Sequence, residues 1–333
     1  MQEKKLWYTA DKRPVYLNNL FHSSSLFMCC SGPSLLQHNL SLLKNLPTFA
    51  VNNAPVALRK HGGFSPTFWT MTDDVGNFCA SIYEDPRILK FLPDGKVDNK
   101  IFDNQAWDRE FPSGNAYKNK KVRDCPGVLY YHRPPKEHEF FDPDTFLTGD
   151  KFCWGNWACR CACGYVRHEE SKDKLCPECG STNRWGSRSC MLVAMRMAYE
   201  LGFRKVFLLG CDFTMQNGQQ NYAFEQDRAG GAVRNNNNTY RMLNERFDSL
   251  VPVFAKEGFQ VWNCYKESGL KSFPYLPFMD AIEMTYAYPE EDRTDGLYDR
   301  KAREKDWKKQ QEAQRHLTGK PETLAEFVEM MTK

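Results

Sequence analysis

Short apolar runs recur along the chain, and helix-like or polar stretches separate them. Six of these runs are nearly continuous, which is typical of strands that are buried on both faces of a parallel sheet. They cover residues 26–30, 48–51, 67–72, 127–131, 205–209 and 259–262. Strands that alternate with helices in this way predict an α/β fold with a doubly wound parallel sheet covered by helices.

The clearest helix precedes the run at 205–209. Ser189 can cap its first turn, and Gly202 suits its end. Apolar side chains between them recur near the 3.6-residue spacing of a helix, at Met191, Leu192, Met195, Ala198, Tyr199 and Leu201. A second helix is expected over residues 35–43. A helix joined to a strand by a tight turn is typical of half a βαβ unit.

Three polar segments interrupt this pattern. Residues 92–126 predict a surface insertion, and residues 213–238, rich in Gln, Asn and Gly, predict a lid loop over a site. The charged stretch 276–333 predicts a helical tail with a solvated face. We therefore expect one core built from two parts, residues 1–150 and 186–275. A further insertion, residues 151–185, separates these two parts.

Composition narrows the function classes only in part. With 41% hydrophobic and 14% aromatic residues, the chain can bury a core, so wholesale disorder is not expected. The sequence contains no run of about 18 apolar residues, so we expect no membrane span. No apolar segment follows the charged N-terminus, so we expect no secretory signal. The net charge of +3 does not indicate nucleic-acid binding. A basic run at Lys118, Lys120, Lys121 and Arg123 fits either contact with an anionic acceptor or a solvated loop.

Five of the thirteen cysteines fall within 21 residues, which indicates metal ligation in a reducing, cytoplasmic compartment (the host cytoplasm if the source is viral). Cys176 and Cys179 lie in a Cys-Pro-Glu-Cys-Gly knuckle, and Cys161 and Cys163 supply the matching half, with Cys159 as a spare. Four thiolates suit tetrahedral zinc and leave no open position, so we expect structural zinc in a zinc ribbon over this insertion. The aromatic and basic residues around it fit base stacking or packing onto the core equally well.

Residue types that bind ligands gather where the predicted strands end, and open α/β sheets bind ligands at the carboxyl ends of their strands. The turn after the first run, Ser31, Gly32, Pro33 and Ser34, can cradle a phosphate, because a helix that starts there offers free N–H groups and its positive dipole end. A helix cap without a ligand carries the same residues. Other strand ends carry Asn52, Asn53, Asp73, Asp74 and Asp212.

Three motifs, taken in order, resemble a known family. They are Gly-Pro-Ser-Leu at 32–35, an asparagine at the next strand end, and Gly-Phe-Arg-Lys-Val-Phe-Leu-Leu-Gly-Cys-Asp-Phe at 202–213. Together they resemble the bacterial CMP-sialic-acid-dependent sialyltransferases and, equally, the relatives of the archaeal 6-hydroxymethylpterin pyrophosphokinase. The resemblance covers about residues 24–75 and 186–270. It implies a Rossmann-like domain that binds a nucleotide with its phosphates at the first turn.

The resemblance also implies a role for each matching residue. The donor phosphate would face Ser31, Gly32, Pro33 and Ser34; the nucleotide would contact Asn52 and Asn53, with Ser187 and Ser189 near it at the helix start. Asp212 would close the site, and Tyr222 in the lid would hydrogen-bond the leaving phosphate.

Two departures from the family concern the donor and the general base. Ser31 stands where the sialyltransferases usually have asparagine, which puts sialic acid in doubt as the donor. Their lid carries a histidine as general base, whereas this chain has none between His168 and His316. Glu225, Asp227 or Asp73 would then take the proton.

Three function classes follow from these observations. The first is a glycosyltransferase that moves a sugar from a nucleotide-sugar donor to a hydroxyl, with a hydroxylated base in viral DNA as one acceptor and with no catalytic metal. The second is a pyrophosphokinase or related phosphotransferase, in which Asp73, Asp74 and Asp212 would hold Mg²⁺. The third is a nucleic-acid-binding protein without activity.

The predicted zinc site is directly testable. We expect about one zinc ion per chain, and Cys176→Ser or Cys179→Ser should release it, because binding of a structural metal is coupled to folding. Elemental analysis of protein purified without chelator measures the ratio. A preparation free of zinc would remove this prediction.

Overall fold

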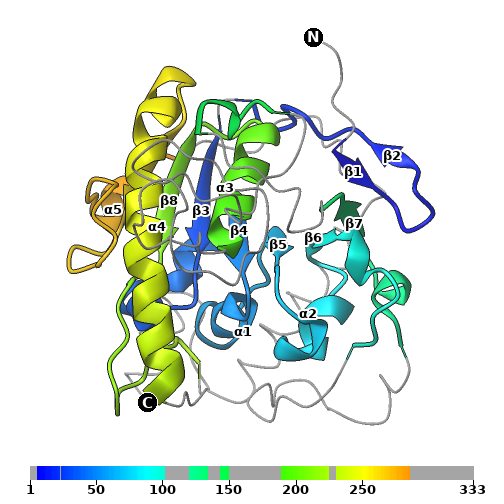
Figure 1. The fold of residues 1–333 in the computed structure, drawn as a ribbon, viewed down its shortest axis with the longest axis horizontal. Coiled ribbons are helices and arrows are strands. Elements are labelled where there is room, and N and C mark those ends of the chain that lie inside the picture. Colours follow the sequence, from blue (N-terminus) through cyan, green and yellow to red (C-terminus); the bar gives the residue numbers. More distant parts are fainter. Residues whose placement is uncertain are drawn as a thin grey trace, which may run out of the picture.

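The computed structural model describes residues 6–22, 24–101, 120–133, 143–149, 189–224 and 230–285. Within these residues, one sheet of nine strands has the order β2-β1-β7-β6-β5-β4-β3-β8-β9 (Figure 1). The strands are β1 (Trp7–Tyr8), β2 (Pro14–Val15), β3 (Ser25–Cys29), β4 (Thr48–Val51), β5 (Phe68–Thr70), β6 (Leu89–Pro93), β7 (Val128–Tyr131), β8 (Lys205–Leu209) and β9 (Gln260–Asn263). Across the sheet from β7 through β6, β5, β4, β3 and β8 to β9, each pair of neighbouring strands is parallel. Strand β1 pairs antiparallel with both β2 and β7.

Helices connect the parallel strands. The α-helices are α1 (Ala54–Ala57), α2 (Ala80–Glu84), α3 (Cys190–Glu200), α4 (Gly230–Lys256) and α5 (Phe278–Glu283). Shorter helical turns are η1 (Pro33–Gln37), η2 (Leu40–Leu43), η3 (Leu58–Gly62), η4 (Val75–Asn77), η5 (Asp94–Lys96), η7 (Val122–Asp124) and η9 (Pro143–Thr145). No helix among the described residues is long and apolar enough to cross a membrane.

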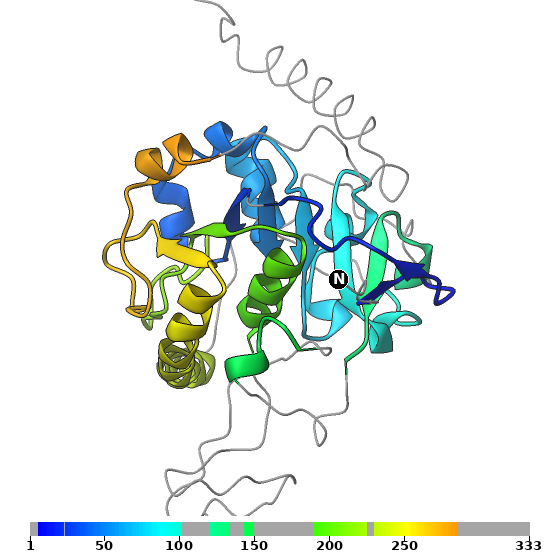
Figure 2. The same cartoon turned by 90° about the horizontal axis from the view of Figure 1, so that it is seen from above.

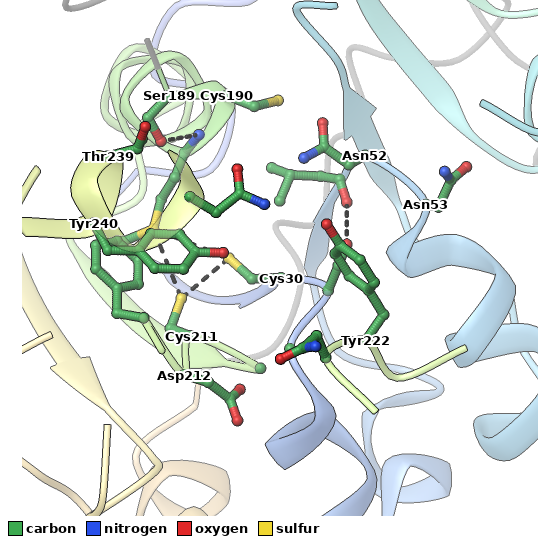
Figure 3. Close-up of a pocket in the computed structure, with 18 of the residues that line it drawn as sticks. Cys30, Asn52, Asn53, Ser189, Cys190, Cys211, Asp212, Tyr222, Thr239 and Tyr240 are labelled. Atoms are coloured by element: carbon green, nitrogen blue, oxygen red, sulfur yellow. Dashed lines mark hydrogen bonds between the residues drawn. The ribbon is translucent and has the colours of Figure 1, made fainter. Parts of the chain in front are cut away.

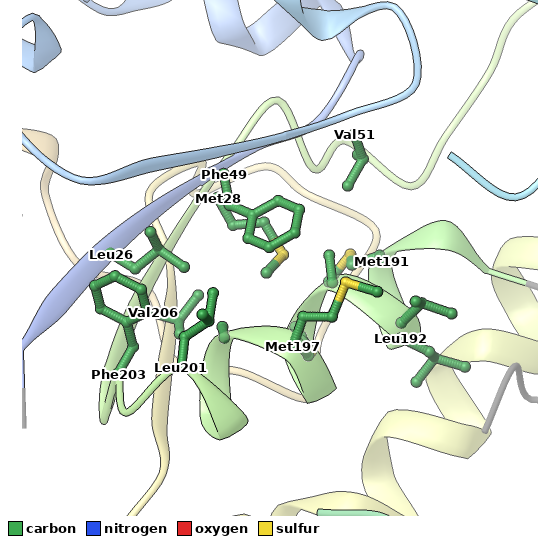
Figure 4. Packing of buried hydrophobic residues seen from close by; sticks show 14 of the residues in the cluster. Leu26, Met28, Phe49, Val51, Met191, Leu192, Met197, Leu201, Phe203 and Val206 are labelled. Atoms are coloured by element: carbon green, nitrogen blue, oxygen red, sulfur yellow. The ribbon is translucent and has the colours of Figure 1, made fainter. Parts of the chain in front are cut away.

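Alternate residues of each strand face opposite layers, so the sheet is buried on both sides. Leu26 and Met28 of β3 pack in one cluster with apolar residues of α3 and α4 (Figure 4). Phe27 and Cys29 pack in a second cluster with residues of η1, α1 and α2. In Figure 2, the green α3 and the yellow α4 lie together on one side of the sheet. The predicted α/β architecture, a mostly parallel sheet covered by helices, is confirmed.

The chain order around β3 determines where a ligand can bind. From β3 the chain adds β4, β5, β6 and β7 in one direction, and then returns to place β8 and β9 on the other side of β3. The connections after β3 and β8 therefore diverge at the junction of these two strands. In open α/β sheets a crevice forms at such a reversal, outside the carboxyl ends of the strands.

The six predicted strands all occur, with small shifts of their ends. The predicted helix caps of α3 also occur: the hydroxyl of Ser189 accepts from the backbone N–H of Met191, and Gly202 follows the helix with a φ of +102°. The sequence interpretation missed β6, whose first residues follow a charged turn, and it assigned Leu92 and Pro93 to the polar insertion although both belong to this buried strand.

Two element predictions are wrong. The helix expected over 35–43 is a pair of 3₁₀ turns, η1 and η2, interrupted at His38 and Asn39, and the side chain of Asn39 caps the second turn. The lid expected over 213–238 ends earlier, because residues 230–238 form the first turns of α4. Asparagine has a weak helix propensity, but Leu243, Phe247, Leu250 and Phe254 bury one face of this helix and override it.

A buried ionic cluster joins the α2 region to β6. The carboxylate of Asp85 accepts from Nε and Nη2 of Arg87 at 2.7 and 2.8 Å, and from the hydroxyl of Ser65 at 2.6 Å. Burial opposes the ionisation of Asp85, but the hydrogen bonds and charge of Arg87, with the charge of Arg59, outweigh it and lower the pKa of Asp85 to about 2. The ammonium of Lys90 is fully buried nearby and donates to three backbone carbonyls, those of Asp85, Ile88 and Pro126.

We expect Asp85→Asn to destabilise the protein by about 3–5 kcal/mol, because the change leaves the buried charge of Arg87 uncompensated. Asp74→Asn is the matched control. Asp74 pairs with Lys96 at 3.2 Å, but its side chain is 85% exposed, so we expect a loss of about 0–1 kcal/mol. Urea unfolding at neutral pH measures both values.

The same residue gives a pH dependence with a defined sign. The pKa of Asp85 is depressed in the folded state, so its contribution to stability is present above its ordinary pKa of 3.8 and is lost as the pH falls toward about 2. Asp85→Asn should remove this part of the acid transition. Equal acid transitions in the variant and the wild type would contradict the assignment.

Candidate functional site

A pocket of about 410 Å³ opens at the carboxyl ends of β3, β4, β5 and β8. The first turn of α3 and one face of α4 complete its wall (Figure 3). Eight residues predicted from the sequence line it: Ser31, Gly32, Asn52, Asn53, Asp73, Ser189, Asp212 and Tyr222. The tertiary structure thus brings together strand ends that lie far apart in the sequence. Three predicted residues, Ser187, Glu225 and Asp227, lie outside the described residues.

The turns after β3 and β8 are bound directly to each other. The carboxylate of Asp212 accepts from the hydroxyl of Ser34 at 2.7 Å and from its backbone N–H at 3.1 Å. The N–H of Gly32 donates to the carbonyl of Gly210 at 2.9 Å. Asp212 lines the pocket but is only 8% exposed, and Ser34 is 1% exposed and does not line it, so this link is a buried part of the pocket floor. Burial raises the pKa of Asp212, although its hydrogen bonds with Ser34 oppose the shift.

These contacts change the interpretation of the predicted phosphate cradle. The amides of Gly32, Ser34 and Leu35 already have acceptors inside the protein, and Pro33 has no N–H. The carboxylate of Asp212 occupies the place at the start of η1 that an anionic ligand was expected to take. Pro33 and Ser34 do not line the pocket, which leaves Ser31 and Gly32 as the part of this turn that a ligand can reach.

Two adjacent asparagines after β4 differ in what their side chains do. Asn52 has a left-handed backbone with a φ of +54°, and its carbonyl accepts from the indole of Trp69 at 2.6 Å. Its side chain lies at the pocket (Figure 3). The amide of Asn53 donates to the carbonyl of Asn77 and accepts from the N–H of Cys79, and this side chain therefore holds the 77–79 loop.

The two adjacent aspartates predicted after β5, Asp73 and Asp74, have different surroundings. Asp73 lines the pocket and accepts from the N–H of Asp74, whereas Asp74 does not line it and pairs with Lys96. Asp212 is committed to Ser34. Within the described ranges, no group of three or more His, Cys, Asp or Glu side chains is placed to hold a metal ion. The three aspartates proposed for Mg²⁺ therefore do not converge, which corrects that interpretation.

The segment after β8 is held by side-chain amides. Asn237 of α4 accepts from the N–H of Met215 at 2.8 Å and donates to its carbonyl at 2.9 Å. Asn221 makes the same pair of contacts with Gln216. The Asn237 contacts join Met215 to α4, and the Asn221 contacts close the loop on itself. Tyr222 follows this loop and lies beside the pocket, where its ring stacks on Phe224.

The sequence interpretation missed the wall that α4 provides. Asn236, Thr239, Tyr240 and Leu243 line the pocket at spacings of three and four residues, as one face of a helix does. The sequence contains this spacing, but the run of asparagines at 235–238 favours a loop when only local propensity is considered. The ring of Tyr240 stacks on Phe213 at 4.9 Å. Burial raises the pKa of Tyr240, so its hydroxyl stays protonated and can donate a hydrogen bond.

The lining of this pocket is polar but carries no described Lys, Arg or His side chain. The basic run, which fits either contact with an anionic acceptor or a solvated loop, is paired with acids where the structure describes it. Lys120 binds Glu84 at 2.6 Å, and Lys121 and Arg123 both bind Asp98, at 3.3 and 3.0 Å. Lys118 and the four predicted zinc cysteines, Cys161, Cys163, Cys176 and Cys179, lie outside the described residues.

Comparisons with known proteins find only distant likeness. No protein-family model and no curated protein matches the chain. Among solved structures, the chain is similar to the MAf glycosyltransferase from Magnetospirillum magneticum AMB-1, with 14% identity and a TM-score of 0.40 over 93% of this chain and 40% of that one. It is also similar to the sialyltransferase CST-II in complex with CMP, with 14% identity and a TM-score of 0.38 over 83% and 93% of the two chains. These likenesses are too distant to assign the chain to a family.

We expect Gly32→Ala to disrupt the junction of β3 and β8. A Cβ at Gly32 would lie 2.0 Å from Oδ2 of Asp212 and 2.6 Å from the carbonyl oxygen of Gly210, so one of the turns must move. The cost should be about 1–3 kcal/mol, as for other overpacked sites. Gly95→Ala is the control, because a Cβ there meets nothing within 4 Å. Urea unfolding compares the two variants, and equal stabilities would show that the junction tolerates the added atom.

Proposed function

We propose that this protein is a glycosyltransferase that binds a nucleotide-sugar donor in the pocket and transfers the sugar to an acceptor hydroxyl. The observation that carries the proposal is a pocket of about 410 Å³ at the strand-order reversal, where amides and hydroxyls lie beside the carboxylates of Asp73 and Asp212 and an apolar part of the lining. Its volume falls within the range of about 300–1,000 Å³ typical of small-molecule sites. The motif resemblance to sialyltransferases supports the same reaction class.

The acceptor proton needs a base that faces the pocket. Asp73 is exposed there, whereas Asp212 is buried and bound to Ser34. In the proposed reaction, the acceptor oxygen bonds to the anomeric carbon while the bond from that carbon to the phosphate oxygen breaks. The acceptor proton passes to Asp73, and the electron pair leaves with the nucleotide.

The leaving phosphate needs hydrogen-bond donors in place of positive side chains. The hydroxyls of Tyr222, Tyr240 and Ser189 all belong to pocket residues. Neutral donors in a partly buried site stabilise a developing anion well, because they are already oriented and little water competes with them. We assign Asn52 to the nucleotide, since its amide offers a donor and an acceptor at the pocket.

Two further parts of the proposal come from the sequence. A structural zinc ion would be held by Cys161, Cys163, Cys176 and Cys179, and the acceptor would be a hydroxylated base in DNA. The separation of Asp73, Asp74 and Asp212 favours transfer without a catalytic metal over the phosphotransferase alternative. A transfer assay should therefore offer both hydroxylated DNA and glycan acceptors, and transfer should continue when magnesium is withheld.

We expect Tyr240→Phe to lower the transfer rate by about 10²–10³-fold, because it removes one donor to the leaving phosphate and keeps the ring stacked on Phe213. Tyr222→Phe should act in the same direction. Tyr275→Phe is the matched control, because Tyr275 is 47% exposed and does not line the pocket. Steady-state kinetics measure the rates, and circular dichroism checks the fold.

Donor binding can be measured before the acceptor is known. A nucleotide or nucleotide sugar at 100 times its Kd should stabilise the protein by about 2.7 kcal/mol in a thermal-shift screen, and Asn52→Ala should reduce this shift. Absence of any shift across nucleotides and nucleotide sugars would refute the proposed function.

A further inference from the structure

Three sulfur atoms meet at the floor of the pocket. They belong to Cys30 directly after β3, Cys211 after β8, and Met191 in the first turn of α3. The Sγ atoms of Cys30 and Cys211 lie 3.1 Å apart (Figure 3), and the Sδ atom of Met191 lies 4.0 and 3.7 Å from them. Three separate segments of the fold therefore place their sulfur atoms at one point.

The cluster is buried and yet faces a route of entry. Cys30, Met191 and Cys211 are 9%, 4% and 1% exposed, and all three residues line the pocket. None of the three has a role in the proposed transfer reaction. The nearest acid in sequence, Asp212, directs its carboxylate to Ser34 beneath Gly32.

The spacing of the sulfur atoms suits a metal ion between them. Metal–sulfur bonds are about 2.3 Å long, so three sulfurs around one ion in a plane are about 4 Å apart. Two sides of the triangle, 3.7 and 4.0 Å, match this value, and the third requires the two thiols to separate by less than about 1 Å. Side-chain rotation of Cys30 or Cys211 can supply that movement.

We propose that Cys30, Cys211 and Met191 form a binding site for a soft monovalent metal ion of the Cu(I) class. Thiolate and thioether ligands select Cu(I), whereas carboxylate and water ligands suit Mg²⁺, Ca²⁺ and Mn²⁺. When the ion binds, two metal–thiolate bonds and one metal–thioether bond form, and the two thiol protons pass to solvent. The metal keeps its oxidation state, so no electron donor or acceptor takes part.

The third sulfur distinguishes this site from a pair of thiols that forms a disulfide. A disulfide would use only the two thiols and leave Met191 with its packing role alone, whereas a three-sulfur metal site also uses its thioether. Burial raises the pKa of the Cys211 thiol well above its ordinary value, which keeps it protonated in the absence of metal. A protonated, buried thiol reacts slowly with oxidants, because the thiolate is the reactive form.

The test is an anaerobic titration of the whole chain with Cu(I) against a Cu(I)-specific chelator. The cysteines expected to bind zinc also bind Cu(I), so the readout is the difference between each variant and the wild type. We expect Cys30→Ser and Cys211→Ser each to lose one equivalent of tightly bound Cu(I). Met191→Leu should lower the affinity of that equivalent at least about tenfold, the loss typical even of groups that only orient a ligand.

Cys190→Ser is the matched control. Cys190 lines the same pocket and is buried to a similar degree, but its thiol donates to the carbonyl of Thr70 at 3.3 Å. This variant should keep the full number of equivalents. Unchanged binding in Cys30→Ser and Cys211→Ser, unchanged affinity in Met191→Leu, or an equal loss in Cys190→Ser would each overturn the three-sulfur site. Nucleotide binding is measured separately, so failure here leaves the proposed function untouched.

Discussion

The carboxylate of Asp212 lies beneath Gly32 and accepts hydrogen bonds from both the N–H and the hydroxyl of Ser34. This contact joins the turn after β3 to the turn after β8 at the point where the strand order reverses. Hydrogen bonds to a charged group contribute about 1.5–3 kcal/mol each, and leaving such a group unpaired costs more. Together with the N–H of Cys30 bound to the carbonyl of Leu209 and the N–H of Gly32 bound to the carbonyl of Gly210, this interaction holds the pocket floor, including Cys30 and Cys211, in place.

The same contact determines what kind of pocket stands above it. Because an internal carboxylate takes the free amide at the start of η1, this turn no longer offers its amides to a phosphate. The neutral polar groups that line the pocket instead include side-chain amides and hydroxyls from the turn after β4, the segment 214–222, α3 and α4. Such neutral groups bind by direction and distance rather than by charge, which suits a ligand with many hydrogen-bonding atoms, such as a nucleotide.

The Asn-rich segment has a structural part in this arrangement. Asn237 and Asn221 each bind both polar groups of one backbone residue, much as a neighbouring strand would. Asn237 thereby holds Met215 against α4, and Asn221 closes the turn that begins at Gln216, so amides fix the backbone of this wall of the pocket. A helix that is buried along Leu243, Phe247 and Leu250 supports this wall from behind.

The sequence by itself determined the layers of the fold and the approximate place of the site. Continuous apolar runs identified six strands, because a strand buried on both faces has no polar side, and the residues after these runs mark the edge where ligands bind. The caps of α3 were equally local, since Ser189 and Gly202 act through backbone groups one to three residues away. The zinc cysteines remain a prediction from spacing.

Only the tertiary structure decided what each site residue does, because hydrogen-bond partners lie far apart in the sequence. Asp212 binds Ser34 across 178 residues, and this contact turned an expected phosphate cradle into a structural link. Asn53 holds a loop while Asn52 faces the pocket, a difference that identical adjacent residues cannot reveal. The burial of one face of α4 made the last part of the expected lid, residues 230–238, a helix, since packing energy outweighs the weak helix propensity of asparagine.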